Sequence, residues 1–142
     1  MIYLNIKIDN VYMFKDTFID FTYPKKVANS SLEGEYLEGF PNIKYKRFCV
    51  LMGANASGKT TLGRVLCMMN NFFNGRAISD ADEIITHSSN PASIEVVYVT
   101  PNRSCINQLT IVFNTEGLIY EAYRSNPLRK SKSLKETLDY LS

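Results

Sequence analysis

The first residues of the chain alternate between apolar and polar side chains. Over residues 2–9 every second position is Ile or Leu, and a period of two predicts a strand with one buried face. A second strand is expected over residues 17–21. Residues 24–46 lose this periodicity and carry Ser, Gly, Glu and Pro, so they are expected to form a loop or an insertion.

An unbroken apolar run follows at Phe48–Met52, which predicts a strand buried on both faces of a sheet. After the next loop, apolar residues recur at helical spacing and predict a helix over residues 58–73. Asn74–Gly75 supplies the expected C-terminal stop. The apolar positions of this helix are Leu62, Val65, Leu66, Met69 and Phe73.

The second half of the chain has the pattern of an antiparallel meander. Residues 77–90 are polar and irregular, with room for one helical turn, and residues 93–100 are expected to form a strand that Pro101 ends. Residues 108–114 and 118–124 predict a hairpin whose turn uses Gly117 at positive φ. Residues 133–142 begin a helical pattern.

Composition places the chain among ordinary globular proteins. Its 142 residues fit one domain, with 45% hydrophobic and 21% charged residues and a net charge of +2. The three cysteines stand far apart, which argues against a disulfide framework and a zinc site. A basic cluster near the C-terminus predicts a solvated surface, and a nucleic-acid patch is the weaker alternative; its members are Arg124, Arg129, Lys130, Lys132 and Lys135.

The sequence shows neither a signal peptide nor a membrane span. The N-terminus lacks the apolar stretch of a signal peptide. The sequence also has no run near the roughly 18 apolar residues that a membrane span needs. A cytoplasmic protein without membrane contact is therefore expected.

The strongest chemical signal is the motif Gly-Ala-Asn-Ala-Ser-Gly-Lys-Thr at residues 53–60. Glycines at both ends of GxxxxGK[ST] let the backbone wrap around phosphates, and the following helix presents its positive N-terminus. The Lys59 ammonium would reach the β- and γ-phosphates, and the Thr60 hydroxyl would coordinate Mg²⁺. The motif therefore predicts binding of ATP with Mg²⁺.

Other motifs narrow the class of nucleotide-binding protein. GTPases need DxxG and NKxD strings, and neither occurs in the sequence. Small-molecule kinases usually continue in a parallel βαβ arrangement, whereas the segment after the first helix here has an antiparallel pattern.

Residues 13–21 (MFKDTFIDF) and 48–66 (FCVLMGANASGKTTLGRVL) give the chain a family resemblance. Over residues 2–124 it resembles the N-terminal part of an ABC-type ATPase head of the SMC/RecF class, close to the bacterial AAA-family ATPases related to OLD proteins. The resemblance carries a phosphate and metal site over to the loop, with Lys59 as its catalytic lysine and Thr60 as the metal ligand. It also implies that the segment around Phe14 and Lys15 lies near the nucleotide. With the backbone donors of the loop, the predicted site comprises Gly53, Asn55, Ala56, Ser57, Gly58, Lys59, Thr60 and Thr61.

The implied fold is an α/β P-loop NTPase with an antiparallel β-subdomain and one long helix after the loop. Residues 1–124 would form the N-terminal lobe of the head, with an insertion at 24–46 and the β-subdomain at 93–124. Residues 125–142 would be a basic linker and the start of a truncated helix.

Such heads hydrolyse ATP with an acidic pair that follows an apolar strand. The one comparable run, residues 96–100, has no acid at its end, and Asp80, Asp82 and Glu83 follow no such strand. No signature motif of the LSGGQ type is present, and Gln108 fits an edge residue better than a glutamine loop. We therefore expect an N-terminal fragment of a longer ATPase that binds ATP weakly and does not hydrolyse it alone.

Three functions are compatible with the sequence. The leading one is an ATPase head that dimerises through ATP and acts in DNA repair or antiviral defence, with DNA or a nuclease as partner. The second is a non-catalytic module that senses ATP and regulates a partner. The third, less favoured, is a phosphotransferase that uses the same loop.

Overall fold

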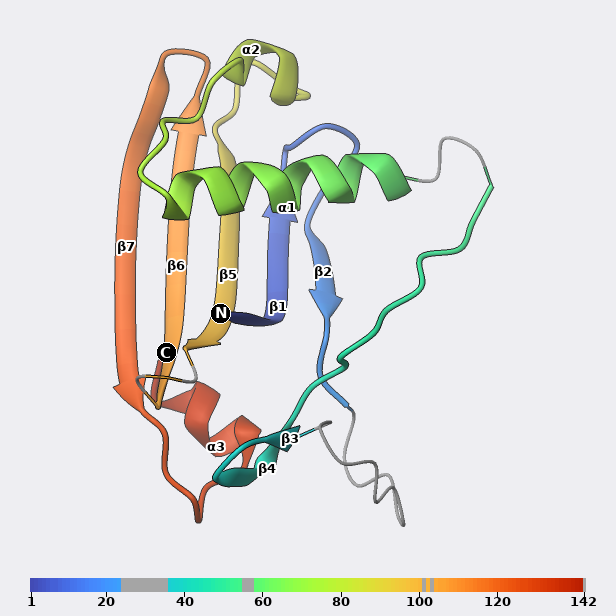
Figure 1. Ribbon diagram of the computed structural model, residues 1–142. Helices are drawn as coiled ribbons and strands as arrows, with labels where there is room; N and C mark the ends of the chain where they lie inside the picture. Colours follow the sequence, from blue (N-terminus) through green and yellow to red (C-terminus); the bar gives the residue numbers. More distant parts are fainter. Residues whose placement is uncertain (24–35, 55–57, 101, 103, 142) are drawn as a thin grey trace.

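The computed structural model describes residues 1–23, 36–54, 58–100, 102 and 104–141. Its main body is one antiparallel sheet of five strands in the order β2-β1-β5-β6-β7 (Figure 1). These strands are β1 (Ile2–Asp9), β2 (Thr17–Asp20), β5 (Ala92–Thr100), β6 (Cys105–Asn114) and β7 (Gly117–Pro127).

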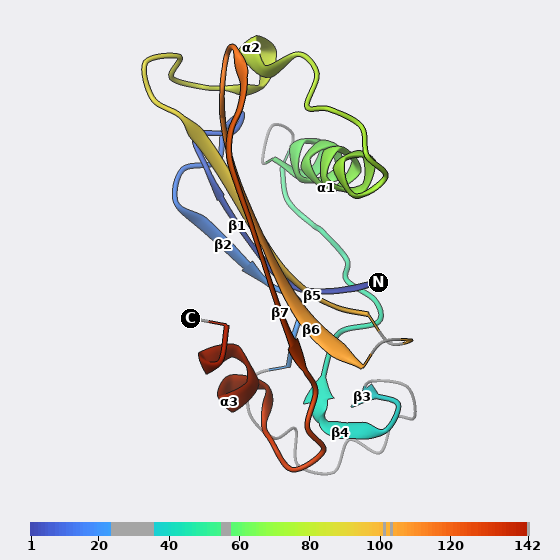
Figure 2. The same cartoon turned by 90° about the vertical axis from the view of Figure 1, so that its left-hand side faces the viewer.

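Helix α1 (Lys59–Phe73) crosses one face of this sheet (Figure 2). Its buried residues Leu62, Val65 and Met69 recur at helical spacing and form one apolar stripe. The stripe packs in a cluster with apolar side chains of β1, β5 and β6, which point to the same face because alternate residues of a strand do so. The buried strand residues of this cluster are Ile6, Ile8, Ala92, Ile94, Val96, Tyr98, Leu109, Ile111 and Phe113.

A second apolar cluster covers the other end of the sheet. It joins Leu4, Val97 and Ile106 to Leu128 and Leu141, which flank helix α3 (Leu134–Asp139). Strands β3 (Tyr36–Leu37) and β4 (Phe40–Lys44) contribute Leu37 and Ile43 to the same cluster. Helices α1 and α3 lie on opposite sides of the sheet (Figure 2), so each end of the sheet has its own covering layer.

The expected α/β class is wrong, because every strand pairing in the main sheet is antiparallel. The error comes from residues 48–52, which were expected to form a doubly buried strand. They lie outside the strands, and Phe48 and Met52 are 84% and 88% exposed. An apolar run becomes a buried strand only where other strands flank it. In this sheet antiparallel strands already lie on both sides of β1, β5 and β6, so residues 48–52 have no place between them.

The other local predictions fare better. The strands predicted at 2–9, 17–21 and 93–100, the hairpin over 108–124 and the helix at 58–73 are all confirmed, with bounds shifted by a few residues. Gly117 has φ +132, as its turn requires. Residues 77–90 contain the single turn α2 (Ala81–Ile84). Of the loop expected at 24–46, residues 24–35 lie outside the described residues, and residues 36–44 pair as β3 and β4. Of the described helices, none is both long and apolar enough to cross a membrane.

The packing of α1 makes a stability prediction. Met69 is fully buried between α1 and the sheet, whereas the next residue, Asn70, is exposed. Met69→Ala should lower the free energy of unfolding by about 2–5 kcal/mol because it leaves a cavity in the core. Asn70→Ala should change it by less than about 0.5 kcal/mol. Urea unfolding of both variants checks this, and equal effects would show that α1 does not depend on this stripe.

Candidate functional site

The predicted phosphate loop leads directly into α1. Gly53 and Ala54 are exposed and lie outside regular structure, Gly58 is the N-cap residue of α1, and Lys59 is its first helical residue. Asn55, Ala56 and Ser57 lie outside the described residues. Thr60 is exposed and Thr61 is half-buried in the first turn of the helix.

Gly58 is held in a conformation and a space that favour glycine. Its φ is +88, in the left-handed region, and a Cβ placed on it would lie 2.9 Å from Sδ of Met13 and 3.6 Å from the Phe14 ring. Both neighbours belong to the connection between β1 and β2. The last glycine of the loop therefore packs against the segment that the family resemblance placed near the nucleotide.

Lys59 turns back onto the loop. Its Nζ donates hydrogen bonds to the carbonyl oxygens of Gly53 at 2.6 Å and Ala54 at 2.7 Å. The side chain thus spans the two described ends of the loop and places an ammonium group over its opening. The first turn of α1 has no acidic residue and its N-cap makes no side-chain hydrogen bond, so no described carboxylate of that turn offsets its positive end.

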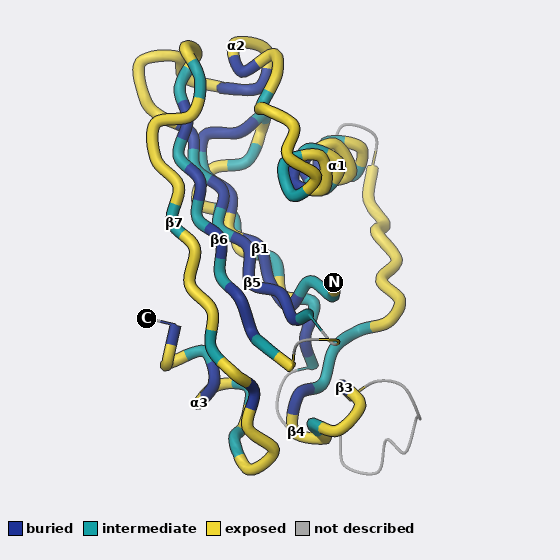
Figure 3. The backbone as a smooth tube through the Cα atoms, turned by 60° about the vertical axis from the view of Figure 1, so that its left-hand side comes forward, coloured by how far each residue is buried: buried dark blue, intermediate teal, exposed yellow. Residues whose placement is uncertain are grey.

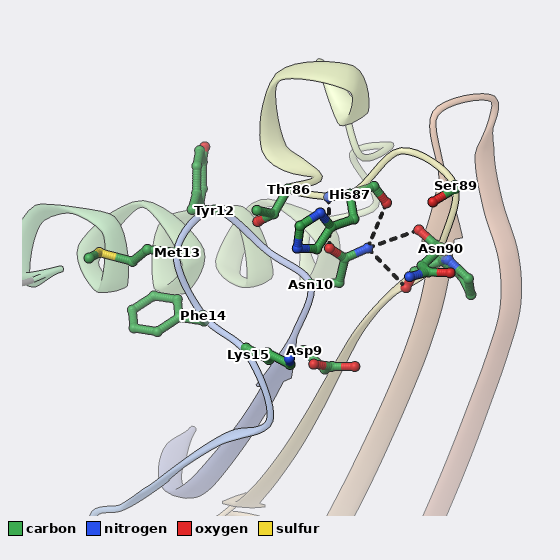
Figure 4. A pocket seen from close by; sticks show the side chains of 11 residues that line it. Asp9, Asn10, Tyr12, Met13, Phe14, Lys15, Thr86, His87, Ser89 and Asn90 are labelled. Atoms are coloured by element: carbon green, nitrogen blue, oxygen red, sulfur yellow. Dashed lines mark hydrogen bonds between the residues drawn. The ribbon is translucent and has the colours of Figure 1, made fainter.

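A groove of about 760 Å³ lies beside this loop, between the β1–β2 connection and residues 86–91 (Figure 4). The Met13 and Phe14 side chains line it and are also the neighbours of Gly58. The groove and the phosphate loop thus share a wall, which the β1–β2 connection provides.

Asn10 fixes the far side of the groove. Its Nδ2 lies 3.0 Å from the carbonyl oxygen of His87, 2.9 Å from that of Asn90 and 3.4 Å from that of Pro91. Its Oδ1 accepts a hydrogen bond from the His87 backbone N–H at 2.9 Å. One buried amide side chain therefore clasps residues 87–91 to the end of β1 (Figure 4).

The sequence pointed to only part of this arrangement. It predicted the strand that Asn10 follows and an irregular segment over residues 77–90, which contains His87, but it gave no role to Asn10 or to residues 89–91. A usable signal exists, since Asn tolerates the left-handed conformation that Asn10 adopts with φ +55. Its partners are 77 or more residues away, so the pairing itself could not be inferred.

Most other candidates stay outside the site. Asp80, Asp82 and Glu83 are exposed at or on α2 and do not line the groove. Gln108 is half-buried within β6, which is an inner strand of the sheet. Among the residues that the structure describes, no group of three or more His, Cys, Asp or Glu side chains could hold a metal ion.

The largest tyrosine pKa shift belongs to the sheet. Burial, together with the neighbouring Tyr123, raises the pKa of Tyr98 to about 12. The Tyr123 hydroxyl donates to Oδ1 of Asn107, as does the Ser125 hydroxyl, each at 2.7 Å. These bonds tie β7 to β6 through Asn107, and a tyrosine whose pKa is raised stays protonated near neutral pH and cannot serve there as a base.

Comparison with known proteins adds no relative. A scan of the sequence against models of protein families finds no match, and a search among curated proteins finds none either. The arguments about this site therefore rest on its own residues.

The Asn10 clasp makes the second prediction. Asn10→Asp keeps the side-chain shape and tolerates positive φ, but it replaces the amide donor with an oxygen that faces three carbonyl oxygens. The free energy of unfolding should fall by about 1–3 kcal/mol, and the His87 amide should exchange faster with solvent. Hydrogen exchange and urea unfolding measure these changes.

Asn114→Asp is the matched control. Asn114 uses Oδ1 to accept from the backbone N–H groups of Glu116 and Gly117, and a carboxylate accepts equally well. Its stability should stay within about 0.5 kcal/mol of the parent chain. If both substitutions had the same effect, the donor bonds of Asn10 would not hold the groove.

Proposed function

We propose that this chain binds ATP with Mg²⁺ through residues 53–61. The observation that carries the proposal is the geometry at Gly58 and Lys59. The glycine adopts φ +88 where the loop enters the 15-residue helix α1, and the lysine turns its ammonium back over the loop. A GxxxxGKT sequence that leads into a helix supports the binding of a polyphosphate at the N-terminal end of that helix.

The phosphates would take the place of the loop carbonyls as partners of Lys59. In the present arrangement its ammonium contacts two neutral oxygens of Gly53 and Ala54. Phosphate oxygens carry negative charge, and charge-assisted hydrogen bonds are about twice as strong as neutral ones. The exchange is therefore favourable, and the positive N-terminal end of α1 adds to it.

Mg²⁺ would bind to the β- and γ-phosphates and to the hydroxyl of Thr60. Thr60 follows Lys59 in the first turn of α1 and is exposed, so its hydroxyl is accessible to a bound metal. Magnesium keeps several of its waters when it binds in this way. One protein oxygen together with the phosphates is thus a sufficient ligand set.

The nucleoside end of the ligand would extend along the β1–β2 connection. Phe14 contacts the position of the Gly58 Cβ and also lines the groove. Its ring is half-buried, and it offers an apolar surface against which a base can pack. Lys15 lines the same groove and is exposed.

We propose that this chain binds ATP but does not hydrolyse it alone. Hydrolysis needs a carboxylate that orients water at the γ-phosphate, and the sequence contains no apolar strand that ends in an acidic pair. We propose that turnover occurs only in an assembly that brings such a carboxylate to the bound ATP. An ATP-sensing module that never hydrolyses its ligand is the second candidate, and the same sequence observation favours it.

Lys59→Ala tests the binding site. The variant should bind Mg·ATP at least about tenfold more weakly than the parent chain, because a hydrogen bond to a charged group contributes about 1.5–3 kcal/mol. Lys135→Ala, which removes an exposed lysine from α3, should leave the affinity unchanged. Isothermal titration calorimetry gives both values. Equal binding by the Lys59→Ala variant and the parent would overturn the proposal.

A phosphate-release assay tests whether this chain hydrolyses ATP on its own. The parent chain and Lys59→Ala should release phosphate from Mg·ATP at the same rate, equal to that of buffer. Release that requires Lys59 would show that this chain holds a complete catalytic site.

A further inference from the structure

The exposed edge of the main sheet is the long strand β7. It has 11 residues, pairs only with β6 in the described sheet, and carries four exposed large hydrophobic side chains. These are Leu118, Ile119, Tyr120 and Tyr123, each 47–57% exposed. In Figure 1 β7 forms the rim of the sheet, and Figure 3 shows α3 and the last described residues beside its lower half.

An edge strand presents unpaired backbone N–H and C=O groups that can pair with another strand. Soluble proteins usually protect long edges with charges, prolines or bulges. Here the protection lies near the two ends of β7. The pairing with β6 skips Ile119, which makes a bulge near the first end, and Pro127 closes the other. The stretch Tyr120–Asn126 between them is regular, and two of its side chains, Arg124 and Asn126, donate hydrogen bonds to the carbonyl oxygens of Leu141 and Tyr140.

The sequence of this stretch complements itself when two copies run antiparallel. A two-fold axis at Ala122 places Tyr120 opposite Arg124 of the second copy, and Glu121 opposite Tyr123. The first pair brings an aromatic ring to a guanidinium group whose Nη1 also donates a hydrogen bond to the carbonyl oxygen of Leu141, and no like charges face each other. The axis also places Gly117 opposite Pro127, so the proline falls at the end of the ladder, where its missing N–H interrupts nothing.

The neighbouring registers are poorer. A two-fold axis at Glu121 would bring two carboxylates face to face, and one at Arg124 would oppose two guanidinium groups. An axis at Tyr123 would place Ala122 against Arg124 and Tyr120 against Asn126, and it leaves one aromatic contact, that of Tyr123 with itself. Ala122 is also the smallest side chain of the strand and is half-buried, so two backbones can approach closely there.

We propose that β7 pairs with β7 of a second copy of this chain, antiparallel about Ala122, and forms a continuous ten-stranded sheet. The contact is independent of the proposed nucleotide site, since it lies at the edge of the sheet opposite to β2. The interface is narrow, and the dimer is therefore weak, with a Kd on the order of 10–100 µM.

Cysteine crosslinking tests the register. Residues at the axis face themselves with Cα atoms about 4.5–5.5 Å apart, within the range of a disulfide. Ala122→Cys should therefore form a 122–122 disulfide under mild oxidation. In Glu121→Cys the two Cα atoms are about 8 Å apart, beyond that range, so crosslinking should be at least about tenfold slower. Peptide mapping by mass spectrometry separates this bond from bonds of the native cysteines.

Sedimentation of the 142-residue chain tests the surface. The average mass should rise toward that of a dimer across the micromolar range, with or without Mg·ATP and equally in Lys59→Ala. Tyr120→Lys should weaken the dimer at least about tenfold, whereas Met52→Lys, at another exposed apolar residue, should not. A monomer at all concentrations, equal crosslinking at positions 121 and 122, or loss of the dimer in Met52→Lys alone would each overturn the proposal.

Discussion

The packing of α1 on the antiparallel sheet is the interaction on which the candidate site depends. Leu62, Val65 and Met69 bury one stripe of the helix against β1, β5 and β6. This contact fixes the direction of the helix axis and the position of its N-terminus. Gly58 and Lys59 sit at that end, so the orientation of the proposed phosphate cradle follows from the apolar core beneath it.

The β1–β2 connection links this core to the groove. Met13 and Phe14 press against Gly58 from one side, and Asn10 holds residues 87–91 from the other. A buried side chain with several hydrogen bonds has little freedom to move, because leaving a buried donor or acceptor unpaired is costly. The loop, the connection and the groove are thus joined through a few residues at the end of β1.

The sequence predicted those elements whose causes are local. Alternation gave β1, β5 and the β6–β7 hairpin, and helical spacing gave α1, because each pattern reflects the geometry of its own segment. The GxxxxGKT motif could be recognised for the same reason, since all its residues lie within one short stretch. The strand predicted at residues 48–52 was wrong, because whether an apolar run becomes a strand depends on which strands the fold places beside it.

The groove could not be predicted for a related reason. Asn10 and His87 meet although 77 residues separate them, and neither belongs to a motif. The fold class failed at the same level, because the order β2-β1-β5-β6-β7 is a property of long-range pairing. Local secondary structure was therefore easier to predict from this sequence than the arrangement of the strands.

The central claim is that the start of α1 and the β1–β2 connection form one nucleotide site. Titration of the isotope-labelled chain with Mg·ATP, followed through its backbone amide chemical shifts, tests it most directly. We expect saturable changes of chemical shift at Gly58–Thr61 and at Met13–Lys15, and no change in β7. Changes confined to the basic residues 129–135, or no saturable change at all, would contradict it.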